Sequence, residues 1–208
     1  MDHEASALPA SEKIRDAIRS DISGIVKVHQ IAFKGFFLDR MGPAFLRAYY
    51  RAILDYEGAI LLVHSDRPGE VDGFAAGFLE PDHFYAHFRS RRIRMLPAIA
   101  LALLRRPNLF IEIVRNTGRV ARAAELNVAA AELASIGTSR RGTGVGSHLL
   151  RAFCERSAAL GADEVRLTTD RDDNGAVVRF YLDHGFEQTG VEFRGERALY
   201  SLARRSNV

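Results

Sequence analysis

The segment that most constrains the fold lies past the middle of the chain, where a strand pattern, a glycine-rich loop and a helical pattern follow one another. Residues Val128–Ile136 are rich in small and apolar side chains and predict a strand. Glycines recur between residues 137 and 146, and helical periodicity over Val145–Leu160 ends at Gly161. In such a loop, backbone N–H groups and the helix N-terminus converge on one point and favour negative charge there. The arrangement therefore predicts a site for a phosphate-bearing ligand.

The spacing of these glycines excludes two common phosphate-binding motifs. A Walker A loop needs Lys directly after its second glycine, and Thr143 stands at that position. The dinucleotide fingerprint Gly-x-Gly-x-x-Gly also fails, because its third glycine would fall on Ser147 or Leu149. What remains is the pattern Arg-x-x-Gly-x-Gly over residues 141–146, preceded by Arg140. Arginines at its start can pair with phosphate oxygens.

A second motif follows at Asn174–Phe186, where the chain reads Asn-Gly-Ala-Val-Val-Arg-Phe-Tyr-Leu-Asp-His-Gly-Phe. It is similar to the second motif of the GNAT superfamily of N-acetyltransferases, Asn-x-x-Ala-x-x-Phe-Tyr-x-x-x-Gly-Phe. Residues 141–146 resemble the pyrophosphate loop of that superfamily. Two departures are mild: Val177 stands where Ala is common, and residues 138–139 stand where Pro often follows the strand. The specific match covers Val128–Phe186.

The resemblance implies an enzyme that moves an acetyl group from acetyl-CoA directly to a primary amine of a small molecule and needs no metal. In such a reaction both substrates bind together, and the neutral amine attacks the thioester. Asn174 is implied to contact the pantetheine arm, with an N-cap role as the alternative. The implied cofactor-binding residues are Ser135, Ile136, Thr138, Arg141, Gly142, Thr143, Gly144, Val145, Gly146, Ser147 and Asn174.

Two side chains are candidates for the proton transfers that this reaction needs. By the resemblance, Tyr181 points at the CoA sulfur and acts as the acid for the leaving thiolate; packing against the sheet is the alternative. Glu132 is the candidate base, directly or through a water, because the superfamily often places an acidic residue there. A solvent-facing or edge position is the alternative for Glu132.

The strand that carries Glu132 is expected to contribute its backbone as well. Strict alternation predicts Glu132, Ala134 and Ile136 on one face of this strand and Ser135 on the other. Backbone N–H groups near Ser135 and Ile136 are expected to polarise the thioester carbonyl in the manner of an oxyanion site.

The whole chain predicts an α/β fold of the GNAT kind, in which helices flank a central, mixed, mostly antiparallel, twisted sheet. Residues 1–11 are expected to form a flexible tail and residues 12–208 a single domain, with a helical elaboration over residues 81–127 between the third and fourth strands. The expected strands are Lys13–Ala17, Ala59–His64, Val71–Leu79, Val128–Ile136, Glu164–Thr169, Phe186–Phe193 and Glu196–Leu202. The expected helices are Ile22–Phe33 with Asp21 as N-cap, one opening at Gly42-Pro43, Val145–Leu160, and one from Asp173 or Asn174 to His184.

Composition narrows the function classes. Apolar residues at 47% and charged residues at 26% are ordinary for a globular chain. A net charge of +3 without a Lys/Arg run argues against nucleic acid as a partner. The single cysteine, Cys154, excludes an intrachain disulfide and fits a reducing compartment, so a cytoplasmic location is expected. The apolar run Met95–Leu104 is too short to span a bilayer, although peripheral contact with a membrane is an alternative to a buried helix.

The motifs do not specify the acceptor amine. Aromatic and Arg side chains within residues 33–50 and 81–127 can form a pocket for an anionic acceptor, such as an amino sugar of surface-polysaccharide synthesis. Core aromatics plus a solvated basic face are the alternative. A protein or peptide amine as acceptor, and a non-catalytic acyl-CoA-binding or regulatory role, are the competing functions. A homodimer is compatible with each of them.

Overall fold

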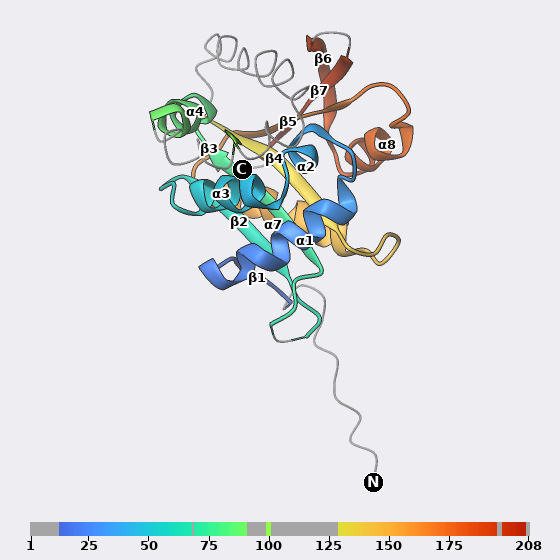
Figure 1. The fold of residues 1–208 in the computed structure, drawn as a ribbon. Coiled ribbons are helices and arrows are strands. Elements are labelled where there is room, and N and C mark those ends of the chain that lie inside the picture. Colours follow the sequence, from blue (N-terminus) through green and yellow to red (C-terminus); the bar gives the residue numbers. More distant parts are fainter. Residues whose placement is uncertain (1–12, 68, 91–98, 101–128, 195–196, 207–208) are drawn as a thin grey trace.

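The computed structural model describes residues 13–67, 69–90, 99–100, 129–194 and 197–206. The described strands form one sheet in the order β1-β2-β3-β4-β5-β7-β6 (Figure 1). Only β4 and β5 pair in parallel, so the expected mixed, mostly antiparallel sheet is confirmed. The strands are β1 (Ile14–Asp16), β2 (Ala59–His64), β3 (Gly73–Leu79), β4 (Ala130–Thr138), β5 (Glu164–Asp170), β6 (Glu187–Arg194) and β7 (Arg197–Arg205).

Helices cover both faces of this sheet. In Figure 1, α1 and α3 lie in front of the sheet and α7 lies behind it. An apolar core on the α7 side includes Leu149, Phe153 and Tyr181, and a second core on the side of α1, α3 and α4 includes Ile25 and Tyr50. The helices are a 3₁₀ turn η1 (Arg19–Asp21), α1 (Ile22–Ala32), α2 (Phe37–Arg40), α3 (Pro43–Leu54), α4 (Pro81–Ser90), α7 (Val145–Ala159) and α8 (Gly175–Asp183).

The expected helix ends are largely confirmed. Pro43 occupies the first turn of α3, where its missing N–H costs nothing. Gly161 and Gly185 follow the ends of α7 and α8 with φ of +88° and +81°, a left-handed conformation that glycine adopts without a Cβ clash. The two predicted N-cap positions are confirmed, but capping by their side chains is not. Asp21 and Asn174 stand at the N-cap positions of α1 and α8, but neither side chain makes a capping hydrogen bond.

Asp21 and Asn174 are instead committed to other partners. The buried Asp21 carboxylate accepts two hydrogen bonds from the Arg15 guanidinium, at 2.6 and 2.9 Å, and one from the backbone N–H of Ile18. Asn174 Nδ2 donates to Thr169 Oγ1 at 2.7 Å and to a backbone carbonyl at the end of β5. The Asn174 side chain therefore ties the start of α8 to β5.

A bulge in β4 overturns the alternation expected for that strand. Gly77 of β3 pairs with Leu133, whereas the residue before it, Ala76, pairs with Ser135. Ala134 is therefore left without a partner on β3. Beyond the bulge, each side chain of β4 lies on the sheet face opposite to the one that strict alternation predicts. Ile136 joins Leu133 in the core on the α7 side, whereas Ala134 and Ser135 face the side of α1 and α3.

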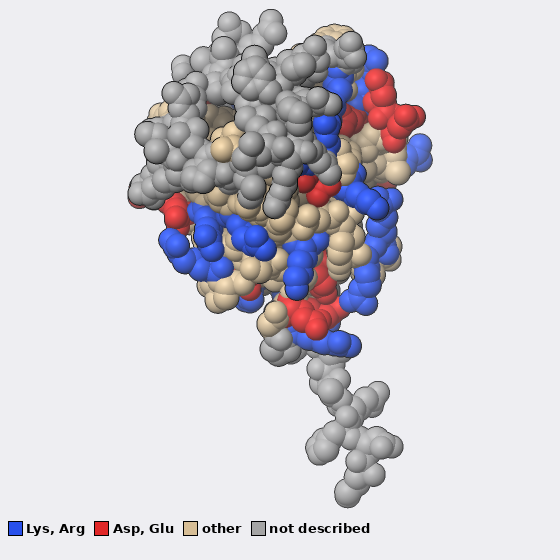
Figure 2. Space-filling model, in the orientation of Figure 1, with Lys and Arg blue, Asp and Glu red and all other residues tan. Residues whose placement is uncertain are grey.

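Several sequence predictions concern residues outside the described part of the chain. These are the tail 1–11, all of the elaboration beyond α4 except residues 99–100, and the run Met95–Leu104 apart from the same two residues. None of the helices in the described part is both long enough and apolar enough to cross a bilayer. Lys and Arg side chains are spread over the face that α1 and α3 form (Figure 2), and Arg47 and Arg51 of α3 are exposed there.

Candidate active site

The centre of the candidate site is a fork between the two parallel strands. Pairing of β4 with β5 ends at Glu132 and Arg166, yet β4 continues to Thr138 and β5 to Asp170. On its outer edge β4 stays paired with β3 up to Thr138, and β5 stays paired with β7 up to Asp170. In these described strands, the backbone groups of β4 that point toward β5 beyond Glu132 thus lack a partner on β5, and they can hydrogen-bond a bound ligand.

The glycine-rich loop connects the end of β4 to the N-terminus of α7. Gly142 and Gly144 have φ of +75° and +77°, so both need the left-handed conformation, and both are exposed. The hydroxyl groups of Thr138 and Thr143 donate to the backbone carbonyl of Arg140, at 3.0 and 3.3 Å. The loop is therefore held by its own backbone while the first N–H groups of α7 remain available to an anion.

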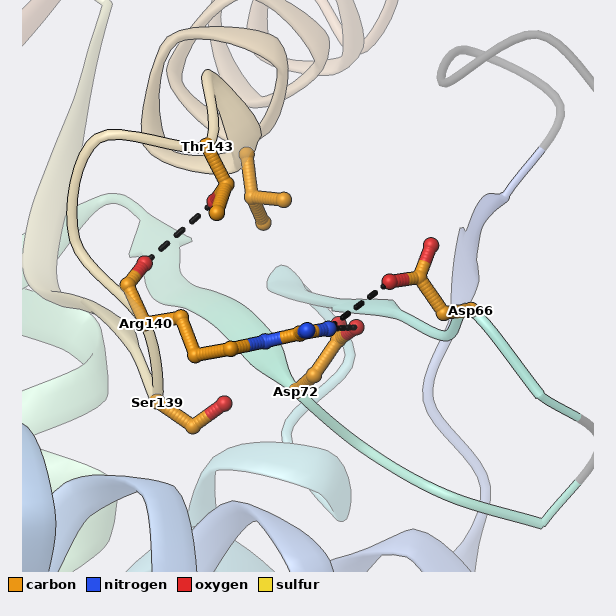
Figure 3. Close-up of a pocket in the computed structure, with 6 residues that line it drawn as sticks. Asp66, Asp72, Ser139, Arg140 and Thr143 are labelled. Atoms are coloured by element: carbon orange, nitrogen blue, oxygen red, sulfur yellow. Dashed lines mark hydrogen bonds and ion pairs between the residues drawn. The ribbon is translucent and has the colours of Figure 1, made fainter.

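Arg140 and Arg141, the two arginines expected to pair with phosphate, have different surroundings. The Arg140 guanidinium lies between two carboxylates (Figure 3), 3.0 Å from Asp66 Oδ2 and 3.8 Å from Asp72 Oδ2. The backbone N–H of Ser139 also donates to the Asp72 carbonyl at 2.8 Å. Arg140 therefore anchors the loop to the β2–β3 turn. Arg141 is exposed and makes no ion pair in the part of the chain that the structure describes.

The same turn holds a group of side chains with the chemistry of metal ligands. One ligand atom each from His64, Asp66 and Asp72 lies within 4.8 Å of the others. Their charges are already compensated, because Lys13 Nζ lies 2.9 Å from Asp66 Oδ1 and Arg140 lies between the two carboxylates. His64 Nδ1 is 2.5 Å from Asp72 Oδ1. The group serves to hold the glycine-rich loop.

Tyr181, the candidate acid, is buried in the core on the α7 side. Its ring makes an edge contact with Phe186, with 5.7 Å between ring centroids. Burial raises the pKa of Tyr181 above that of a free phenol, so the hydroxyl stays protonated at neutral pH. The protonated hydroxyl can donate a hydrogen bond, although its raised pKa makes it a weaker proton donor than a free phenol.

Glu132, the candidate base, lies on the opposite face of the sheet from Tyr181, at the last residue pair before the fork. Its carboxylate is half-buried, and Oε1 accepts a hydrogen bond of 2.6 Å from the Tyr85 hydroxyl of α4. Arg166, its neighbour on β5, contacts Glu164 through Nε, and its Nη2 is shielded from solvent and has no hydrogen-bond partner among the described residues. Tyr85 belongs to the aromatic set expected to form an acceptor pocket, but nothing local in the sequence links Tyr85 or Arg166 to Glu132.

Ser135 is also held by side chains that the sequence analysis did not connect to the site. Its side chain lies near the hydroxyl of Tyr50, which is 2.7 Å from Nδ1 of His29. All three residues are buried. Tyr50 and Phe84 also show that part of the aromatic set proposed for an acceptor pocket belongs to the core; the Phe84 ring stacks on Phe78 with centroids 3.7 Å apart.

Comparison with known proteins agrees with this geometry. The sequence model of the acetyltransferase (GNAT) family matches residues 26–186. No curated protein matches the sequence. Similar solved structures include a ribosomal-protein-alanine N-acetyltransferase from Brucella melitensis, with a TM-score of 0.60 and 15% identity over 92% of this chain and 98% of that one.

Two further structural neighbours have similarly low identity. The ribosomal-protein-S18-alanine N-acetyltransferase from Escherichia coli has a TM-score of 0.58 and 13% identity over 94% of each chain. The PaiA N-acetyltransferase from Thermoplasma acidophilum, solved with coenzyme A, has a TM-score of 0.53 and 12% identity over 92% of this chain and 97% of that one. These likenesses support the fold, and the family model covers most of the sequence. The protein belongs to the GNAT family of acetyltransferases.

Proposed function

We propose that the protein transfers the acetyl group of acetyl-CoA directly to a primary amine of a small molecule. The observation that carries this proposal is the fork, because β4 and β5 separate beyond Glu132 beside a glycine-rich helix N-terminus. An extended pantetheine arm can hydrogen-bond the unpaired edge of β4 while its pyrophosphate lies on the loop. The loop contributes residues 141–147, with Arg141 as the exposed cation.

The proposed chemistry divides among three groups, two on β4 and one on α8. Glu132 takes the proton of the incoming ammonium, directly or through a water, so that a neutral amine can attack the thioester carbon. Backbone N–H groups near Ser135 and Ile136, just beyond the bulge, stabilise the oxyanion of the tetrahedral intermediate. Collapse of that intermediate breaks the carbon–sulfur bond, and Tyr181, whose raised pKa keeps it protonated, acts by donating a hydrogen bond to the departing CoA thiolate, which takes up a proton from water on release.

The acceptor class that we propose first is an amino sugar of surface-polysaccharide synthesis. Two features support an anionic acceptor of this kind: the exposed arginines of α3 and the shielded Nη2 of Arg166 beside Glu132. A peptide with an N-terminal alanine is the second candidate, because two structural neighbours are named for alanine acetylation of ribosomal proteins. We also propose that the protein acts in the cytoplasm, where acetyl-CoA is available.

The first test separates cofactor binding from turnover. Acetyl-CoA at about 100 times its Kd is expected to stabilise the fold by roughly 2.7 kcal/mol, which raises Tm by about 5–10 °C, whereas ATP and NAD should not. Thiol release from acetyl-CoA is then followed with three acceptors: UDP-linked glucosamine, an alanyl peptide and ethanolamine. Thermal stabilisation without thiol release for any primary amine would favour the acyl-CoA-binding module. Absence of stabilisation in folded protein would contradict the proposal.

A further inference from the structure

The hydrogen bond between Tyr85 and Glu132 joins two residues that are 47 positions apart, at a distance of 2.6 Å. Both side chains are half-buried, so the bond lies between the core and the surface rather than in open solvent. An O–H···O bond of this length to a carboxylate is in the range of charge-assisted hydrogen bonds. We propose that Tyr85 is a positioning residue that fixes the Glu132 carboxylate at the fork and favours its ionised form. The proposal rests on the proposed function of Glu132 as the base.

The position of the Tyr85 ring is set by the same strand pairing that places Glu132. Phe78 of β3 is the cross-strand partner of Glu132. The Tyr85 ring makes an edge contact with Phe78, with centroids 5.5 Å apart and an interplanar angle of 83°, and a second contact with Phe84 at 5.5 Å. The phenol is thus packed against the residue that sits beside the carboxylate it binds.

The backbone connection between β3 and α4 is short and holds Tyr85 in place. Helix α4 starts at Pro81, directly after β3 and a single residue, Glu80, whose φ of +49° makes the turn tight. The Glu80 N–H donates to the carbonyl of Ala130 in β4 at 3.1 Å. The first turns of α4 are therefore tied to β4 itself, and the Tyr85 hydroxyl reaches Glu132 without a flexible linker.

Only the hydroxyl group of Tyr85 can have the proposed effect. A donor that bonds the ionised form of a carboxylate favours that form, and it also restricts rotation of the carboxylate. A base of this kind must be ionised and aimed at the acceptor nitrogen before the amine is deprotonated. The Tyr85 ring contributes packing alone, so exchanging the hydroxyl for hydrogen separates the two contributions.

Other titratable and charged groups on the elements packed against Glu132 must be considered in any pH measurement. β3 contributes none, and α1 contributes His29, whose Nδ1 is bonded to Tyr50. On β5, Arg166 is the register neighbour of Glu132 and contacts Glu164. Among the described residues, the remaining charged or titratable groups on β5 and α4 are Asp170, Asp82, His83, His87 and Arg89, and α1 also carries the exposed Lys27.

The experiment measures the titration of the Glu132 carboxyl carbon by ¹³C NMR on protein labelled at glutamate, with Glu132→Gln used to assign the resonance. In Tyr85→Phe the titration midpoint is expected to move to higher pH by about one unit, a roughly tenfold change in proton affinity. Tyr56→Phe is the matched control, because the Tyr56 hydroxyl donates to the Leu79 carbonyl at 3.4 Å. The control midpoint should stay within about 0.2 units of wild type.

An unchanged midpoint in Tyr85→Phe, or an equal shift in both variants, would overturn the proposal. Tyr85→Met also lacks the hydroxyl at similar volume, carries the same expectation and replaces the Phe variant if that variant does not fold. Stabilisation by acetyl-CoA is measured on every variant and should equal that of wild type. If acetyl-CoA did not stabilise the wild-type protein, the proposed function would be contradicted. The NMR comparison tests the link between Tyr85 and Glu132 whether or not acetyl-CoA stabilises the protein.

Discussion

The hydroxyl of Tyr50 on α3 lies 2.7 Å from Nδ1 of His29 on α1, in the core between the helices and the sheet. Burial lowers the pKa of His29 to about 4, and the nearby charge of Asp39 acts weakly in the opposite sense. The neutral imidazole is also packed against the Phe33 ring, with centroids 4.6 Å apart. His29 is therefore a core residue whose protonation is disfavoured by the native packing.

This burial predicts a specific pH dependence of stability. An unfolded histidine titrates near 6.5, so between about pH 6.5 and pH 4 the unfolded chain binds more protons than the folded chain. The contribution of His29 is therefore fully present above about pH 6.5 and is lost as the pH falls toward 4, by up to about 3 kcal/mol. Urea unfolding of wild type and His29→Gln between pH 7.5 and 4.5 measures it. The slope of the unfolding free energy against pH should be smaller in the variant.

His83 offers the matched control for that measurement, because its side chain is 74% exposed. His83→Gln should leave the pH dependence of wild type unchanged. Equal slopes in wild type, His29→Gln and His83→Gln would contradict the role assigned to the burial of His29.

The two arginines of the glycine-rich loop should differ in their effect on the cofactor. Arg141→Ala removes the exposed cation and is expected to raise the Kd for acetyl-CoA about tenfold. Arg140→Ala removes a contact to Asp66 and Asp72, so Kd should change less than about threefold and stability by less than about 1 kcal/mol. Calorimetric titration measures both variants. Arg151→Ala removes an exposed arginine of α7 and should have no effect on Kd. If Arg140→Ala weakened acetyl-CoA binding as much as Arg141→Ala, the assignment of Arg140 as an anchor of the loop would be wrong.

Tyr181→Phe tests the proposed hydrogen bond to the leaving thiolate. Because the hydroxyl is proposed to act only on the leaving thiolate, kcat should fall by roughly 10–100-fold while the Kd for acetyl-CoA stays within about twofold. Thiol release with the best of the three acceptors gives kcat, and calorimetric titration gives the Kd for acetyl-CoA. Tyr200→Phe changes another tyrosine packed against the same core and should retain full activity. An unchanged kcat in Tyr181→Phe would leave Tyr181 as a packing residue alone.

Gly77 should be among the least tolerant positions of the sheet. A Cβ atom at Gly77 would overlap the carbonyl oxygen of Glu132 and the ring of Phe153, both of which are fixed by the sheet and the core. Gly77→Ala is therefore expected to destabilise the fold by more than about 2 kcal/mol, measured by urea unfolding. At Gly190, on edge strand β6, an added Cβ meets nothing within 4 Å, and Gly190→Ala should cost less than about 1 kcal/mol. Similar losses in both variants would contradict this reading of the β3–β4 contact.

The local elements of the site could be predicted from the sequence because they depend on neighbouring residues. The start of α7 at Val145, the left-handed glycine after it at Gly161, and the β2–β3 hairpin follow from short-range patterns. The spacing of glycines after β4 excluded two other phosphate-binding motifs, and together with the motif at residues 174–186 it indicated the family, which the family model confirms. These features need no knowledge of which segments pack together.

The side-chain environment of the site was decided by tertiary structure. The bulge at Ala134 depends on pairing with β3 and places Ser135 on the face opposite to the one expected from strict alternation. Arg140 reaches Asp66, 74 positions away, and Tyr85 reaches Glu132, 47 positions away. Sequence alone determined the loop and the helix ends, because backbone conformation is set locally, and the resemblance to the family indicated the candidate catalytic groups. Only the packed fold determined which partner each polar side chain binds, because those partners meet through strand pairing and core packing.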